Sequence, residues 1–202
     1  MLIADVIRVM LLKQHGGIWL DLDTIILSSR AEKMFARNEN FLLSFFGDPV
    51  KRSVHLASIN SIPNAEVMNL WFEFIKGKLE NLNADTVVGW DFFGNSFIND
   101  YAKNHTEEIE IIDRRLVMPE IPLISDSVSA EKAYHEYYFF QSRHIEDVTA
   151  DMLFLHNSWT PQIFKTIGRN EFIRCNFTMA NVLMAALEMK RDLKSPPIRF
   201  VR

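Results

Sequence analysis

The sequence predicts an α/β fold in which a mostly parallel sheet is flanked by helices. Short apolar strand patterns alternate with amphipathic helix patterns along 202 residues, and this alternation favours strands joined by helical crossovers. The apolar fraction of 48% is ample for a buried core. One domain over residues 1–202 is therefore expected, with two small domains as the alternative, and a C-terminal amphipathic helix over 177–195 is expected to pack on it.

Six apolar stretches carry the strand pattern, and they are found at 18–20, 24–27, 41–46, 55–62, 109–112 and 152–156. Three later segments carry the helix pattern, at 65–80, 91–104 and 177–193. The aromatic segment 134–140 is interpreted as a strand or a lid. In the helix that precedes Gly16, five apolar residues at helical spacing predict one buried stripe: Ile3, Val6, Ile7, Met10 and Leu11.

Two glycines and two carboxylates follow this first helix. Gly16 and Gly17 end the helix and reverse the chain, which requires a positive φ or a close backbone approach. Asp21 and Asp23 follow the apolar strand 18–20, and on a regular strand residues two apart share a face. Two carboxylates on one face repel each other, so a cation is expected there, and oxygen ligands favour Mg²⁺ or Mn²⁺.

Composition excludes several classes of protein. The net charge of −4 argues against a nucleic-acid partner or an anionic membrane surface as the main ligand. The single cysteine, Cys175, excludes an intramolecular disulfide framework and favours a reducing compartment. No apolar run approaches the ~20 residues that span a bilayer, and no signal peptide is recognised. The expected location is the cytoplasm, with the membrane surface as an alternative.

The strongest pattern runs from Ala4 to Asp23 as Ala-Asp-x-x-Arg-x-x-x-Leu-x-x-x-Gly-Gly-x-Trp-x-Asp-x-Asp. It resembles the signature of glycosyltransferases with a DXD sugar-binding region. That group includes capsular polysaccharide synthesis proteins, yeast-type α-mannosyltransferases and the clostridial glucosylating toxins. The resemblance implies a GT-A-like fold, that of nucleotide-diphospho-sugar transferases. It also implies transfer of a sugar from a nucleotide sugar to a saccharide or other hydroxyl acceptor, with retention of anomeric configuration, in polysaccharide or glycoconjugate synthesis.

The resemblance also implies roles for the residues that match it. Asp23 resembles the direct metal ligand, and Asp21 the partner of ribose or sugar hydroxyls and of metal-bound water. Arg8 resembles the contact to donor sugar or phosphate, so Asp21, Asp23 and Arg8 form the expected catalytic set. Asp5 resembles the acceptor of hydrogen bonds from the transferred sugar, and Gly17 is expected on the donor-binding side. A guanidinium fork suits oxyanions, which agrees with this assignment.

A second candidate region ends the strand pattern at 152–156. Related enzymes take a further metal ligand from a C-terminal strand or loop, and the resemblance assigns that role to His156. An imidazole is more acceptable to Mn²⁺ than to Mg²⁺, so Mn²⁺ is the favoured cofactor. Ser158 and Trp159 are expected to donate to the departing phosphate. Asn60 and Ser61 are weaker candidates for the acceptor side of the cleft.

Most other histidines are interpreted as surface residues, since none has a partner at metal-ligand spacing. They are His55, His105, His135 and His144.

A GT-A-like enzyme has a first β-α-β unit before the motif, and this unit binds the nucleotide. Here the helix starts within the first few residues, so that unit is expected to be absent. The chain is then a gene fragment, the product of a late start codon, or a form that takes the missing half from another chain.

Two alternatives to a transferase stay open. One is a non-catalytic remnant or interaction module with the same fold. The other is a D-x-D phosphatase, whose motif is matched less well because Thr24 directly follows Asp23.

Overall fold

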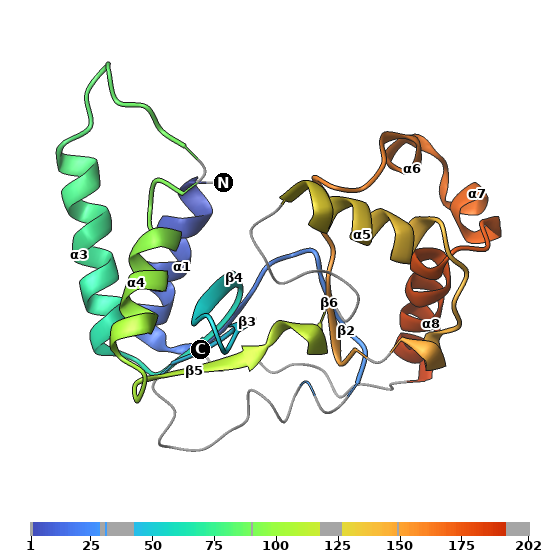
Figure 1. The fold of residues 1–202 in the computed structure, drawn as a ribbon, viewed down its shortest axis with the longest axis horizontal. Coiled ribbons are helices and arrows are strands. Elements are labelled where there is room, and N and C mark those ends of the chain that lie inside the picture. Colours follow the sequence, from blue (N-terminus) through green and yellow to red (C-terminus); the bar gives the residue numbers. More distant parts are fainter. Residues whose placement is uncertain are drawn as a thin grey trace.

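The computed structural model describes residues 2–28, 31, 43–89, 91–117, 127–148 and 150–192 of the chain. The elements follow in this order: α1 (Leu2–His15), β1 (Gly17–Leu20), β2 (Thr24–Ile26), β3 (Leu43–Asp48), β4 (Ser53–Ser61), α3 (Glu66–Glu80), α4 (Asn95–Asn104), β5 (Ile109–Asp113), η1 (Arg114–Leu116), α5 (Ser127–Phe139), η2 (Ile145–Asp147), β6 (Met152–Phe154), α6 (Gln162–Thr166), α7 (Arg169–Arg174) and α8 (Thr178–Asp192). Helices α1, α3 and α4 lie on one side of the strands, and α5 to α8 gather on the other (Figure 1).

The described strands form two sheets. The larger has four strands in the order β1-β4-β3-β5, and β2 pairs with β6 in a second sheet. β1 with β4, β4 with β3, and β2 with β6 are antiparallel, while β3 and β5 are parallel. The α/β class is confirmed as a mixed arrangement. The predicted mostly parallel sheet is wrong for the strands that the structure describes, and the GT-A-like topology stays a prediction.

The lengths of the connections explain this outcome. Four residues, 49–52, join β3 to β4, and a link of that length connects antiparallel neighbours. β3 and β5 are joined through β4, α3 and α4, which is long enough for a parallel crossover. Alternating helix and strand patterns do not distinguish these two kinds of connection.

Two buried apolar clusters lie on opposite faces of the four-stranded sheet. Phe45 and Ile111 belong to the cluster formed with α1, α3 and α4. Their neighbours Phe46 and Ile112 belong to the cluster formed with α5, α8, β2 and β6. Side chains alternate between the faces of a strand, so the sheet separates two cores.

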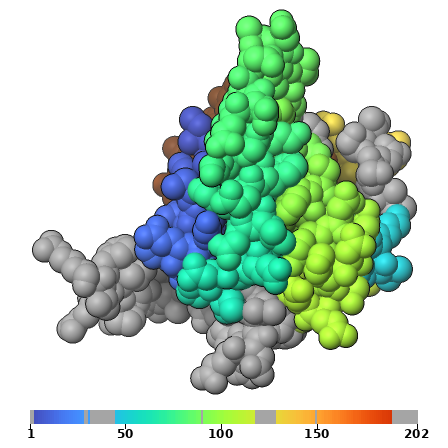
Figure 2. Space-filling model, turned by 90° about the vertical axis from the view of Figure 1, so that its left-hand side faces the viewer, coloured from blue at the N-terminus to red at the C-terminus, as the bar shows by residue number. Residues whose placement is uncertain are grey.

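Helix α1 buries a different face from the predicted one. Val9 and Leu12 are 0% and 2% exposed, and Arg8 is buried beside them. The four predicted residues that are exposed instead are Ile3, Ile7, Met10 and Leu11. Helix α1 lies beside α3 with α4 next to it, and together they form one face of the molecule (Figure 2). The helix carries apolar residues at helical spacing on both faces, and the period alone does not choose between them.

Segment 134–140, predicted as a strand or a lid, lies mostly in helix α5. Tyr134, Tyr137 and Tyr138 are three and four residues apart, which is the spacing of one helix face, and all three are buried. The predicted helix over 177–195 is found as α8, which packs against α5 and α7, and positions 193–195 lie outside the described residues. No described helix has the length and apolar character needed to cross a membrane.

The matched variants Leu12→Ala and Leu11→Ala test which face of α1 is buried. Leu12 is 2% exposed, so its truncation leaves a cavity and should lower the free energy of unfolding by about 2–4 kcal/mol. Leu11 is 46% exposed, and the same truncation should change that free energy by no more than about 0.5 kcal/mol. Urea unfolding followed by circular dichroism measures both. A larger loss for the Leu11 variant would contradict the observed orientation of the helix.

Candidate functional site

A double glycine joins helix α1 to strand β1. Gly16 and Gly17 have φ values of 63° and 89°, in the left-handed region that glycine adopts without strain. At Gly16 a Cβ would lie 2.5 Å from Pro63 Cδ and 2.8 Å from the carbonyl oxygen of Ser61, so no larger residue fits. The predicted glycine turn is confirmed, and it places α1 against the strand that leads to Asp21.

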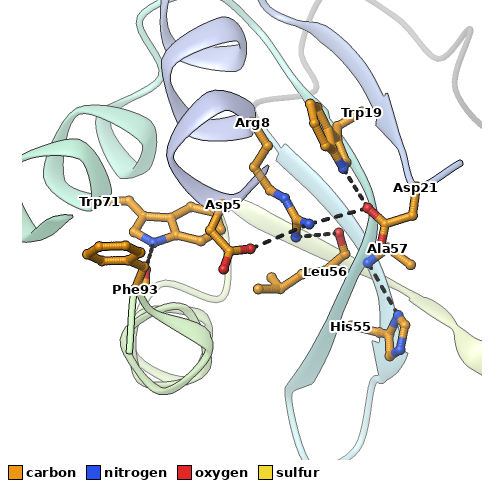
Figure 3. Close-up of polar contacts among 9 residues, drawn as sticks. All are labelled: Asp5, Arg8, Trp19, Asp21, His55, Leu56, Ala57, Trp71 and Phe93. Atoms are coloured by element: carbon orange, nitrogen blue, oxygen red, sulfur yellow. Dashed lines mark hydrogen bonds and ion pairs between the residues drawn. The ribbon is translucent and has the colours of Figure 1, made fainter. Parts of the chain in front are cut away.

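Arg8 lies at the centre of the site and is only 5% exposed. Its Nη1 donates to the Leu56 carbonyl oxygen at 2.8 Å, and its Nη2 donates to Asp21 Oδ1 at 3.2 Å (Figure 3). The same Nη2 lies 3.5 Å from Asp5 Oδ1, and the guanidinium carbon lies 5.2 Å from the centre of the Trp19 ring. One buried cation therefore ties helix α1 to both β4 and the turn after β1.

An irregularity in strand β4 turns two backbone carbonyls toward this site. Phe45 of β3 lies opposite Ile59, and the next residue, Phe46, lies opposite His55. Residues 56–58 of β4 therefore have no partner on β3 and form a bulge. The carbonyl oxygen of Ala57 accepts the backbone N–H of Asp21 at 2.8 Å. The carbonyl oxygen of Leu56, one residue earlier, accepts the hydrogen bond from Arg8. The bulge thus holds both the guanidinium of Arg8 and the backbone of Asp21.

The two carboxylates follow β1, as expected, and they occupy a turn between β1 and β2 that is not regular strand. The backbone N–H of Thr24 donates to the Asp21 carbonyl oxygen at 3.0 Å, and Leu22 is fully exposed. Asp21 Oδ1 also accepts a hydrogen bond from Trp19 Nε1 at 2.8 Å. The charge of Asp21 still acts on Asp23 across this turn, where it contributes to the raised pKa of that carboxyl.

Burial raises the pKa of both Asp5 and Asp23 above the ordinary range of aspartate. For Asp23, the charge of Asp21 adds to the effect of burial on the pKa. For Asp5, the Arg8 guanidinium lowers the pKa, whereas the carboxylates of Asp21 and Asp91 raise it further. A cation placed among these groups would favour their charged forms.

Strand β6 brings the backbone that precedes His156 next to the turn of Asp23. The pairing of β2 with β6 places Thr24 opposite Phe154. The backbone N–H of Leu155 donates to the Asp23 carbonyl oxygen at 2.8 Å, and His156 follows directly. The pairing therefore places the backbone of His156 next to the turn that carries the carboxylates.

The immediate neighbour of the His156 imidazole is a cation. Nη2 of Arg114 lies 3.2 Å from His156 Nε2. Ring centroids of Trp159, His55 and Tyr134 lie 4.0, 5.6 and 5.7 Å from that of His156. Burial and the charge of Arg114 lower the pKa of His156 to about 4, and burial lowers the pKa of Arg114 to about 10. Burial first, and then the same guanidinium, hold the pKa of His55 well below its usual range.

Sequence reasoning missed Arg114, and it placed three packed histidines on the surface. His55, His105 and His135 pack against aromatic rings, whereas His144 is exposed as predicted. For His55 the sequence held a usable signal, because it lies inside a stretch already recognised as a strand. For Arg114 the only signal was its position immediately after an apolar strand.

The remaining predicted site residues are more scattered. Ser158 is exposed in the turn after β6, and Trp159 is partly buried. Asn60 and Ser61 lie on β4 at the Gly17 end, and Ser61 is buried with its hydroxyl donating to the carbonyl of the next residue. A Cβ at Gly17 would meet no atom within 4 Å, so the space beside this residue is open. Their roles toward donor and acceptor stay predictions.

The residues fit a divalent cation in part. Asp21 and Asp23 supply two carboxylates, and Mg²⁺ is commonly held by one or two carboxylates together with substrate phosphates. Nε2 of His156 does not fit this role, because it faces the guanidinium of Arg114. Within the described ranges, no three histidine, cysteine, aspartate or glutamate side chains are grouped closely enough to hold a metal ion.

Fold and site together define a mixed α/β protein whose acidic turn is held by a buried arginine. Residues 1–111 match the family described as capsular polysaccharide synthesis protein, and this part includes α1, the glycine turn and both carboxylates. The match covers more than half of the chain, so the protein belongs to this family. No curated protein and no solved structure matches the chain.

Arg8→Met and Trp19→Phe test the contacts that hold the site. Loss of Arg8 leaves Asp5 and the Leu56 carbonyl without their buried partner, so the free energy of unfolding should fall by about 3 kcal/mol. Trp19→Phe removes one hydrogen bond to Asp21 and should cost about 1 kcal/mol. Urea unfolding measures both, and equal losses would contradict a central role for the guanidinium.

Proposed function

We propose that this protein is a metal-dependent glycosyltransferase that moves a sugar from a nucleotide-sugar donor to a saccharide or other hydroxyl acceptor. Its family supports a role in capsular polysaccharide synthesis. The observation that carries the proposal is the buried contact of Arg8 with Asp21, next to Asp23, inside the part of the chain that matches the family. Such a group of charges suits a phosphorylated, hydroxyl-rich ligand.

Each charged residue then has a distinct task. Arg8 holds Asp21 through Oδ1, so the second oxygen of that carboxylate is the atom we assign to donor hydroxyls. Asp5 lies against the same guanidinium and is assigned to the transferred sugar. Asp23 carries no such contact to Arg8 among the described interactions and is assigned to the metal ion. When bound, that ion would neutralise the negative charge that develops on the departing diphosphate.

The choice of ion and the stereochemistry belong to the same proposal. Two aspartates are oxygen ligands that suit both Mg²⁺ and Mn²⁺, and the earlier preference for Mn²⁺ depended on an imidazole ligand. Retention of anomeric configuration rests on the family resemblance and is tested by following the product anomer with proton NMR.

Asp23→Asn tests the proposed metal site, with Asp85→Asn as the matched control in an exposed loop. Removing a direct carboxylate ligand should weaken Mn²⁺ binding by about tenfold or more and abolish metal-stimulated hydrolysis of a nucleotide sugar. Isothermal calorimetry measures the first effect, and release of nucleoside diphosphate measures the second. The Asp85 variant should match the wild-type chain in both.

The same experiment separates the enzyme from the non-catalytic alternative. A remnant of the fold should bind neither Mn²⁺ nor a nucleoside diphosphate. If the wild-type chain binds neither, or if both aspartate variants behave alike, the proposed function is wrong.

The pH dependence of metal binding follows from the raised pKa of Asp23. The ion binds the deprotonated carboxylate, so its affinity should be constant near neutral pH and fall on acidification through a pKa above the ordinary aspartate value. In the absence of metal, the raised pKa of Asp23 has the opposite effect on stability. The protonated carboxyl is favoured in the folded chain, so folding is more favourable at low pH and loses this contribution as the pH rises through the pKa of Asp23. Asp23→Asn should therefore raise the melting temperature at neutral pH. A lower melting temperature of this variant would contradict the assigned environment.

A further inference from the structure

We propose that Arg114 and His156 form a fixed pair that contacts an oxyanion of the substrate, and that His156 is not a ligand of the metal ion. This inference deepens the proposed function, because it divides the site into a carboxylate side that holds a cation and a guanidinium side that holds an anion. It rests on the orientation of two side chains that come from distant parts of the chain.

The direction of the hydrogen bond between the two residues fixes the imidazole proton. A guanidinium has five N–H donors and no acceptor. Nη2 of Arg114, 3.2 Å from Nε2 of His156, must therefore donate, and Nε2 must accept with its lone pair. The proton of the neutral ring is then on Nδ1. In this tautomer neither ring nitrogen has a lone pair to offer a metal ion.

The distance leads to the same conclusion. A metal ion binds an imidazole nitrogen at about 2.0–2.1 Å along the direction of its lone pair. At Nε2 of His156 that direction is taken by the Arg114 nitrogen, so the ion and the guanidinium would have to occupy the same space. The guanidinium is also positively charged, and its repulsion would add to the steric conflict.

Packing holds both partners in this arrangement. Arg114 is the first residue after β5, which is fixed by its parallel pairing with β3. The His156 ring contacts the rings of Trp159, Tyr134 and His55 on several sides. A rotation of the imidazole away from Arg114 would have to break these ring contacts as well as the hydrogen bond.

The charge of the pair suits an oxyanion. His156 stays neutral near physiological pH because burial and the neighbouring guanidinium disfavour its protonated form. Arg114 then supplies the positive charge of the pair, and its planar fork matches phosphate oxygens. The diphosphate of a nucleotide-sugar donor carries such oxygens, and β6 places this pair close to the turn of Asp23.

Nitrogen-15 NMR of the histidine rings tests the pair in the full chain without metal. We expect His156 to show a protonated Nδ1 and an unprotonated Nε2, and we expect its resonances to be unchanged on addition of Mg²⁺. His156→Gln should leave the affinity for Mn²⁺ within about twofold, whereas Asp23→Asn should weaken it. A proton on Nε2, a shift of the ring signals with Mg²⁺, or a tenfold loss in the His156 variant would overturn the proposal.

Binding of inorganic pyrophosphate, measured by calorimetry, tests the oxyanion. Arg114→Gln should weaken it by about tenfold, and Arg114→Lys, which keeps the charge, should weaken it less. Arg115→Gln is the matched control, because this neighbour is exposed and pairs with Asp113.

Melting curves establish that each variant is folded. Equal effects at both arginines, or no pyrophosphate binding by the wild-type chain, would show that the anion assignment is wrong. The NMR result is independent of metal binding and of turnover, so it separates failure of this pair from failure of the proposed function.

Discussion

The buried guanidinium of Arg8 is the interaction on which the candidate site depends. It reaches a backbone carbonyl of β4, the carboxylate of Asp21 and the carboxylate of Asp5, and so it joins a helix, a strand and a turn that are distant in the sequence. A buried cation is costly unless it is paired and hydrogen-bonded. The bulge in β4 and the rotation of α1 both supply such partners. They are therefore best understood as parts of one arrangement that keeps this charge in the interior.

The sequence predicted the glycine turn, the acidic pair and the presence of an imidazole at the end of β6, because these depend on local residue types and spacing. It did not predict which face of α1 is buried. Asp5 and Arg8 were expected to contact the donor, but the burial of Arg8 also turns the apolar residues Ile7 and Leu11 to the surface. Periodicity describes a helix equally well in either orientation, and the tertiary contacts of Arg8, Val9 and Leu12 select one.

The parts that sequence reasoning missed are all products of long-range pairing. The strand directions depend on connection length, and the bulge in β4 is a matter of hydrogen-bond register, which no residue type marks. The pairing of Arg114 with His156 joins positions 42 residues apart. An assignment made from a strand-end histidine alone could not include the guanidinium that faces it. With that guanidinium in place, Nε2 of His156 uses its lone pair to accept a hydrogen bond and not to bind a metal ion.

The tight turn at Gly16 links more than a helix and a strand. Its backbone fits against Pro63 and the Ser61 carbonyl, and the adjacent amide of Asn64 donates to the Lys13 carbonyl oxygen at 2.8 Å. The end of α1, the start of β1 and the chain leading into α3 are thus closed on one another. Such a closed set of contacts opens as one cooperative unit. The acidic turn at the far end of β1 is therefore anchored, through β1, to contacts that also hold the chain entering α3.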